Sequence, residues 1–201
     1  VLDTLLIEDA ENPDSAHDFG RDVLPAALDR FKVIAYDFRD LNGKTARYWR
    51  DVGTLDAYYD ANMDLVNVTP ELNLYDERWP IHTRLEQAPP AKFVFAQEGR
   101  RMGVAVDSIV SHGCIVSGGK VVRSVLSPGV RVNSFCNIDS SIVLSRARIG
   151  RNAQIRRAIV DTAVDVPEDS VIGFDHEKDR AAGYHVTESG IVVVPSQGRN
   201  L

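Results

Sequence analysis

The sequence predicts a chain of two parts: a mixed α/β segment with a connector over residues 1–92, and a parallel β-helix with a C-terminal cap over residues 93–201. Aliphatic residues recur at steps of 6, 6 and 5 over residues 109–172, which indicates a coiled repeat. The earlier residues instead show helical spacing and one short strand pattern. A stretch with four prolines lies between, at residues 67–91, and is typical of a connector.

Two short helices are predicted at the start of the chain. Residues 1–9 place leucines at helical spacing. A second helix is expected to begin at Asp22, whose side chain can cap free backbone N–H groups, and to run through Leu28. Pro25 would lie in its first turn, where the missing N–H does no harm.

One strand and a third helix are predicted next. Residues 32–38 alternate in a strand pattern and contain two aromatic residues, and residues 39–47 form a polar loop. Thr54 follows a glycine and can cap a helix whose apolar residues extend to Val66.

The second part contains twelve aliphatic residues in the repeating positions. Those seventeen apart form three expected columns: Ile109, Leu126, Val143 and Val160; Ile115, Val132, Ile149 and Val166; and Val121, Ile138, Ile155 and Ile172. Three short strands per turn, each with one inward aliphatic residue, predict a triangular parallel β-helix. Solenoids of this hexapeptide type are typically left-handed, and the apolar residues 191–194 are expected to cap the C-terminal end.

Composition excludes several classes of partner. The net charge of -6 argues against nucleic acid, because phosphate-backbone binding needs clustered Lys and Arg. The longest apolar runs are only a few residues long, so no membrane span is expected. Cys114 and Cys136 lack metal-site or disulfide-scaffold spacing and indicate a reducing, cytoplasmic compartment.

Asp51 is the first candidate for chemistry. It lies three residues ahead of the third predicted helix, whose free N–H groups and partial positive charge attract phosphate. A carboxylate there could hold a Mg²⁺ ion that also holds phosphate oxygens. A simpler interpretation makes Asp51 a turn residue and places the nearby Trp49 in the core.

Asp18 and Phe19 are a second candidate pair. The carboxylate could accept hydrogen bonds from sugar hydroxyls, and the ring could pack on an apolar sugar face. The simpler interpretation is a helix-entry turn that is capped by Asp18.

Arginines give the predicted β-helix a basic tract, at positions 131, 146, 148, 151, 156 and 157. Arg131 and Arg148 are seventeen apart and should stack on neighbouring coils. A solvated face paired with Asp165 is the simpler interpretation. The alternative is an anionic effector site or subunit interface that uses Arg131, Arg148, Arg156 and Arg157.

Taken in order, several motifs resemble those of bacterial glucose-1-phosphate adenylyltransferases, the ADP-glucose pyrophosphorylases. The motifs are His17-Asp18-Phe19-Gly20-Arg21-Asp22, Tyr48-Trp49-Arg50-Asp51-Val52-Gly53-Thr54, Asn73-Leu74-Tyr75-Asp76 with Trp79-Pro80-Ile81, Pro89-Pro90-Ala91-Lys92-Phe93, the hexapeptide repeat and Glu188-Ser189-Gly190-Ile191-Val192-Val193-Val194. The resemblance implies a remnant of a Rossmann-like nucleotidyltransferase domain followed by a left-handed parallel β-helix domain.

The resemblance also implies a reaction: ATP and glucose 1-phosphate give ADP-glucose and pyrophosphate, for glycogen synthesis. Asp51 matches the family's second metal-binding Asp, with Mg²⁺ as cofactor. Asp18, Phe19 and Trp49 match residues placed around glucose 1-phosphate. Sugar-phosphate or nucleotide effectors and a homotetramer are further expectations.

Several expected family features are absent from these 201 residues. The Gly-rich, Arg-containing nucleotide loop, the first metal-binding Asp and the phosphate-binding Lys are not found, so we expect a C-terminal portion that is inactive alone. Two alternatives remain open. One is a hexapeptide-repeat acyltransferase that uses His112, and the other is a non-catalytic regulatory subunit of the same family.

Overall fold

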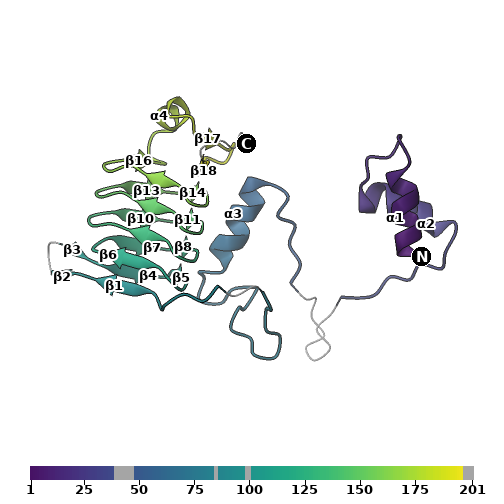
Figure 1. Ribbon diagram of the computed structural model, residues 1–201, viewed down its shortest axis with the longest axis horizontal. Helices are drawn as coiled ribbons and strands as arrows, with labels where there is room; N and C mark the ends of the chain where they lie inside the picture. Colours follow the sequence, from purple (N-terminus) through teal and green to yellow (C-terminus); the bar gives the residue numbers. More distant parts are fainter. Residues whose placement is uncertain (39–47, 84–85, 98–100, 197–201) are drawn as a thin grey trace. The chain divides into compact units, whose positions relative to one another are not determined.

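The computed structural model describes residues 1–38, 48–83, 86–97 and 101–196 (Figure 1). The chain divides into two compact units, Val1–Arg47 and Tyr48–Leu201. The loop that was expected at residues 39–47 lies outside the described residues.

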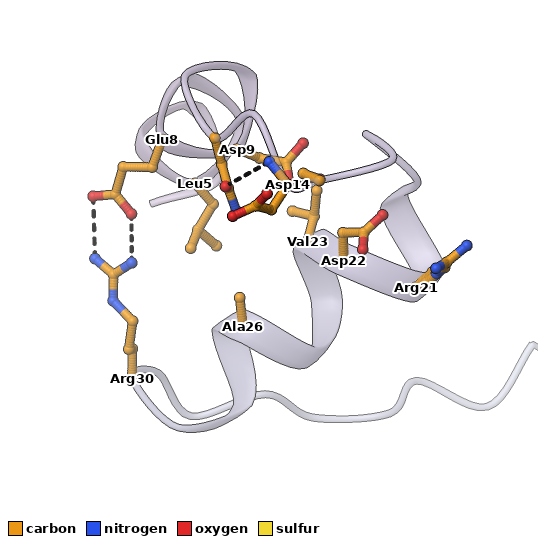
Figure 2. A pocket seen from close by; sticks show the side chains of 11 residues that line it. Leu5, Glu8, Asp9, Asp14, Arg21, Asp22, Val23, Ala26 and Arg30 are labelled. Atoms are coloured by element: carbon orange, nitrogen blue, oxygen red, sulfur yellow. Dashed lines mark hydrogen bonds and ion pairs between the residues drawn. The ribbon is translucent and has the colours of Figure 1, made fainter.

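The first unit contains α1 (Leu2–Ala10), a π-helical turn η1 (Phe19–Val23) and α2 (Leu24–Leu28). They pack around the buried side chains of Leu5, Val23 and Ala27. Figure 2 shows Glu8 of α1 facing Arg30, which follows α2; the two side chains form a bidentate ion pair. The first predicted helix is therefore confirmed.

The second predicted helix is present as α2, which ends at Leu28 and has Pro25 in its first turn as predicted, but the predicted cap at Asp22 is wrong. The helical segment begins at Phe19, and its cap is Asp18, whose Oδ1 accepts a hydrogen bond from the Arg21 N–H at 2.7 Å. Asp22 lies inside the turn, and its Oδ2 accepts from the Asp18 N–H at 3.1 Å. The two carboxylates therefore satisfy N–H groups at the same helix end, as in a capping box.

The strand predicted at residues 32–38 is not formed. A strand pattern becomes a strand only when a neighbouring segment satisfies its N–H and C=O groups. No described strand pairs with these residues. Local alternation was therefore insufficient to predict the element.

The predicted third helix is present as α3 (Leu55–Asp64). Thr54 caps it as expected, since its Oγ1 accepts from the Ala57 N–H at 3.1 Å. The helix ends at Asp64, before Val66. The described residues between α3 and residue 92 contain neither helix nor strand, as a connector would.

Short parallel strands build the solenoid of the second unit in three sheets. The first sheet contains β1 (Lys92–Val94), β6 (Ile115–Ser117), β9 (Arg131–Val132), β12 (Arg148–Ile149) and β15 (Asp165–Val166). The second contains β4 (Val104–Val106), β7 (Lys120–Val122), β10 (Asn137–Asp139), β13 (Gln154–Arg156) and β16 (Val171–Ile172). The third contains β5 (Ile109–Val110), β8 (Val125–Leu126), β11 (Ile142–Val143), β14 (Ala158–Val160) and β18 (Val192–Val194).

Other elements lie at the ends of the coils. The antiparallel pair β2 (Ala96–Gln97) and β3 (Arg101–Met102) interrupts the first coil. After β16 come α4 (His176–Ala181) and β17 (His185–Val186), which pairs antiparallel with β18. Because β18 pairs parallel with β14, the predicted C-terminal cap strand is confirmed.

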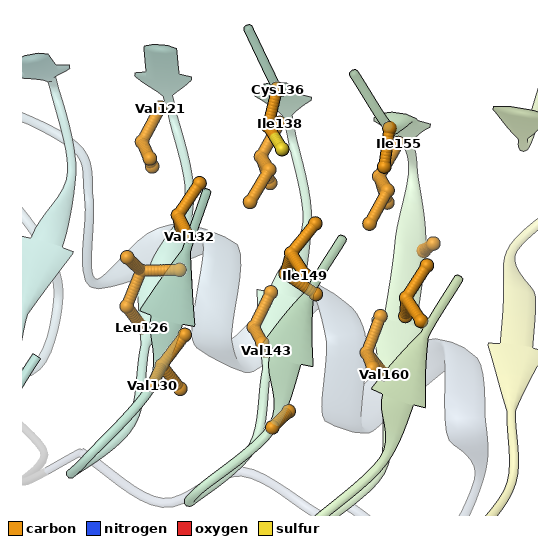
Figure 3. Packing of buried hydrophobic residues seen from close by; sticks show 14 of the residues in the cluster. Val121, Leu126, Val130, Val132, Cys136, Ile138, Val143, Ile149, Ile155 and Val160 are labelled. Atoms are coloured by element: carbon orange, nitrogen blue, oxygen red, sulfur yellow. The ribbon is translucent and has the colours of Figure 1, made fainter. Parts of the chain in front are cut away.

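Buried aliphatic side chains fill the interior of the coils (Figure 3). The predicted column of Val121, Ile138, Ile155 and Ile172 is aligned by the strand registers. The columns Val132, Ile149, Val166 and Leu126, Val143, Val160 are also buried. The parallel β-helix is therefore confirmed, and its coils agree with the left-handed hexapeptide type.

The first members of two columns were assigned wrongly. Ile115 aligns with Arg131, and Val116 is the fully buried partner of Val132. Likewise Val110, not Ile109, aligns with Leu126.

A shorter corner explains this shift of one residue. The register pairs Val116 with Val132 and Lys120 with Asn137. Residues 117–119 therefore span the corner of the first coil, and residues 133–136, one residue more, span the equivalent corner of the next coil. Gly118 has a φ of 75°, which favours glycine. A Cβ on Gly119 would lie 2.8 Å from Val132 Cγ1, so the tight corner needs a residue without a side chain.

No helix among the described residues is long and apolar enough to span a membrane.

We predict that Val132→Asp lowers the free energy of unfolding by about 3 kcal/mol or more, because it buries a carboxylate among aliphatic side chains. Val171→Asp is the matched control, since Val171 is 59% exposed and precedes inward Ile172. Urea unfolding followed by circular dichroism measures both variants. Equal stability of the two would contradict the inward assignment of Val132.

Candidate functional site

Helix α3 lies against the outer surface of the third sheet (Figure 1). Its Tyr59 packs in a buried cluster with Ile142, Ile159, Ile191 and Val193. The Tyr59 hydroxyl donates to the Ser140 carbonyl at 2.6 Å, so its one polar group is satisfied. The helix that follows the Asp51 segment is therefore fixed to the solenoid by apolar contact.

Asp51 forms the turn that leads into α3. Its Oδ1 accepts from the Gly53 N–H at 2.9 Å, one residue before the Thr54 cap. This is the turn that the simpler interpretation predicted, and it leaves the carboxylate exposed. Trp49 is 86% exposed, so its assignment to the core is wrong. Both side chains are accessible to a ligand.

Asp56, in the first turn of α3, contacts the loop between β17 and β18. Its Oδ1 accepts from Thr187 Oγ1 at 3.0 Å and from the Ser189 hydroxyl. The Ser189 hydrogen bond is the main cause that lowers the pKa of Asp56 below its ordinary value. The ionised carboxylate is therefore the form that holds this contact.

Asp18 and Phe19 lie in the first unit, and Trp49 and Asp51 in the second. Phe19 lines a pocket of roughly 240 Å³ together with Leu6, Asp9 and His17. His17 Nδ1 lies 3.0 Å from Asp9 Oδ2. The Ser15 hydroxyl and then His17 lower the pKa of Asp9 by hydrogen bonding.

Asp18 serves a structural role here. Its Oδ1 caps η1, as the simpler interpretation expected. The Phe19 ring is 48% exposed and so can contact a ligand. A sugar-binding role for Asp18 would have to share the carboxylate with the cap.

The arginines are distributed over separate sides of the solenoid. Arg131 and Arg148 are register partners in the first sheet, as predicted, and Arg148 Nε lies 4.0 Å from Asp165 Oδ1. The guanidinium of Arg156 lies 4.5 Å from the centre of the Phe174 ring. Arg157 instead contacts Tyr59 and Ser189. Arg131 and Arg148 therefore form one stacked pair, while Arg156 and Arg157 take part in other contacts.

The described residues contain no group of three or more His, Cys, Asp or Glu side chains that could hold a metal ion. Asp51 offers one exposed carboxylate, a ligand type that Mg²⁺ prefers. Asp51 therefore fits as one ligand of a Mg²⁺ site whose other ligands come from elsewhere, and it cannot form a complete site alone.

Sequence reasoning missed Asp56, Thr187 and Ser189. An Asp in the first helical turn is a common sequence feature. No local pattern links it to hydroxyls more than 130 residues away.

Two family models match the chain. Residues 1–68 match the nucleotidyl transferase model, and residues 89–194 match the model described as GlmU-like, C-terminal hexapeptide. A glucose-1-phosphate adenylyltransferase of Koribacter versatilis is 59% identical over 194 residues, covering 96% of this chain and 46% of the relative. The chain belongs to the family described as GlmU-like, C-terminal hexapeptide, and it is similar over most of its length to glucose-1-phosphate adenylyltransferases.

Other adenylyltransferases show the same pattern of coverage. The protein of Rhodopirellula baltica is 52% identical over 191 residues, covering 94% of this chain and 43% of the relative. The protein of Paramagnetospirillum magneticum is 51% identical over 205 residues, covering 100% of this chain and 47% of the relative. The chain spans about half the length of the curated relatives that it matches.

We predict that Asp56 stabilises the docked α3 at neutral pH and loses this effect in acid. Because the folded state lowers the pKa of Asp56, the contribution is present above the unfolded pKa and disappears as pH falls through the lower, folded pKa. Asp56→Ala should therefore lower the melting temperature at pH 7 and have a smaller effect near pH 3. Asp60→Ala, an exposed change on the same helix, is the control. A pH-independent difference would contradict the ionic role.

Proposed function

We propose that the complete protein transfers the adenylyl group of ATP to glucose 1-phosphate, which gives ADP-glucose and pyrophosphate for glycogen synthesis. The similarity to adenylyltransferases over nearly the whole chain carries this proposal. It includes both the nucleotidyl transferase match and the hexapeptide match. The present chain would be the C-terminal portion, divided into catalytic-domain residues 1–92 and β-helix residues 93–201.

Asp18, Phe19 and Trp49 are proposed to contact the glucose 1-phosphate. The exposed rings of Phe19 and Trp49 offer apolar surfaces on which a sugar face can pack. Asp51 is proposed as one carboxylate ligand of Mg²⁺, with phosphate oxygens and residues beyond this chain as other ligands. Bound Mg²⁺ would supply neutralisation of phosphate charge during the transfer.

The protein residues supply orientation in this proposal. A phosphate oxygen of the sugar substrate is already a nucleophile, so no general base is required of this chain. Asp51 is held by the Gly53 N–H, which restricts the carboxylate before any ligand binds. Such preorganisation is the main contribution that positioning groups make to phosphoryl and nucleotidyl transfer.

We further propose a cytoplasmic homotetramer that is regulated by sugar-phosphate or nucleotide effectors, with Arg131, Arg148, Arg156 and Arg157 as candidate effector or interface residues. Nucleic acid and membrane are not proposed as partners. The adenylyltransferase relatives favour nucleotidyl transfer over the acyltransferase alternative. The regulatory-subunit alternative is distinguished by the assay below.

We expect the 201-residue chain to make no ADP-glucose, because the family's Gly-rich nucleotide loop and its first metal-binding Asp are not found in the sequence. The longer protein should release pyrophosphate only when ATP, glucose 1-phosphate and Mg²⁺ are all present. A coupled pyrophosphate assay measures both. Activity of the chain would refute the first expectation, whereas an inactive longer protein would favour the regulatory subunit.

We expect Asp51→Asn to lower the kcat of the complete enzyme on the order of 10²-fold, about 3 kcal/mol of transition-state stabilisation, with little effect on folding. The residue is exposed, so the loss would come from metal binding and charge neutralisation. Trp49→Ala should instead act mainly on the KM for glucose 1-phosphate. A kcat within about threefold of wild type at saturating Mg²⁺ would leave Asp51 as a turn residue only.

A further inference from the structure

Five residues join α3 to the C-terminal cap in a contact that we name the α3 clasp. Its members are Asp56 and Tyr59 of α3, Arg157 after β13, and Thr187 and Ser189 between β17 and β18. Asp56 accepts from both hydroxyls. Arg157 Nη2 donates to the Ser189 carbonyl at 3.3 Å, and its guanidinium lies 5.5 Å from the centre of the Tyr59 ring.

Thr187 is the buried centre of the clasp. Its hydroxyl donates to Asp56 and accepts from the Ile191 N–H at 3.1 Å. Ile191 directly precedes β18, the last parallel strand of the third sheet. The clasp therefore connects the first turn of α3 to the strand that ends the solenoid.

The same turn of α3 is continuous with the Asp51 segment. Asp51 accepts a hydrogen bond from the Gly53 N–H, and Thr54 caps the helix by accepting from the Ala57 N–H. Asp56 directly precedes Ala57 in this first turn. The first N–H groups of a helix have no partner inside it, so a helix end opens more easily than the helix interior. The contacts of Asp56 with Thr187 and Ser189 therefore oppose local unfolding of the helix end that follows the Asp51 turn.

We propose that the α3 clasp fixes the position of Asp51, so that Thr187 and Ser189 are positioning residues for the proposed Mg²⁺ ligand. This inference rests on the proposed function, in which Asp51 binds Mg²⁺. Tyr59 and its apolar partners keep α3 docked when the hydroxyls are removed, because their cluster does not include Thr187 or Ser189. Loss of the hydroxyls therefore loosens the helix start without undocking the helix.

The first test uses amide hydrogen exchange of the 201-residue chain, with Thr187→Val/Ser189→Ala as the variant. We expect the Gly53 and Ala57 amides to exchange about fivefold faster, as when one ordinary hydrogen bond no longer opposes local opening. The control is Ser170→Ala, whose hydroxyl donates to Pro167 O within its own turn. Unchanged exchange at both amides would overturn the proposal. If the double variant fails to fold, Ser189→Ala alone, at an exposed residue, is judged by the same criterion.

The second test measures the Mg²⁺ concentration for half-maximal activity of the complete enzyme. We expect this concentration to rise at least about threefold in the double variant. In Ser189→Thr, which keeps the hydroxyl, it should remain close to the wild-type value. A purely structural role would lower the melting temperature and leave this concentration as in Ser170→Ala, which would overturn the proposal. An inactive wild-type enzyme would instead refute the proposed function, while the exchange experiment still tests whether the clasp holds the Asp51 turn.

Discussion

Burial of aliphatic side chains inside a coil of short strands is the constraint on which the second unit depends. Each side of a coil contributes a large inward aliphatic residue, and the strand registers stack these residues directly over one another. Their side chains are almost fully removed from solvent, so the hydrophobic effect favours adding each coil to the last. The corner at Gly118 and Gly119 shows that inward packing is maintained when a corner is one residue shorter. The strands before this corner shift by one residue, so that Val110 and Val116 take the inward positions.

The third sheet is apolar on both faces, and this determines where α3 lies. Val143 and Val160 face the interior, while their neighbours Ile142 and Ile159 are buried on the outside with Tyr59. An exposed apolar sheet face would be costly, and α3 covers it. The requirement to cover a sheet thus places the segment with Asp51 beside the cap of the solenoid. In this arrangement a structural contact and a candidate catalytic loop share one helix.

Candidate site residues in this chain combine structural and proposed functional roles. Asp18 caps η1 and Asp51 forms the turn before α3, and both are also proposed ligands of substrate or metal. These roles are compatible for Asp51 because one carboxylate carries two oxygens with several acceptor positions. The exposed rings of Phe19 and Trp49 lack such structural duties, since neither belongs to a buried core. They are the clearest ligand-contact candidates of the set.

The sequence by itself determined the solenoid, the cap strand at its end, α1, and the Thr54 cap of α3, because each depends on periodicity or on hydrogen bonds within a few residues. It also proposed Asp51 and Phe19 as ligand-contact candidates, through motifs that are local. It failed for residues 32–38, since a strand needs a partner from elsewhere, and for Ile115, since the register depends on steric room between coils. Only the tertiary structure decided that the arginines separate and that Asp56 meets Thr187 and Ser189. Such contacts join residues far apart in the sequence, so they depend on the stacked coils and on no local pattern.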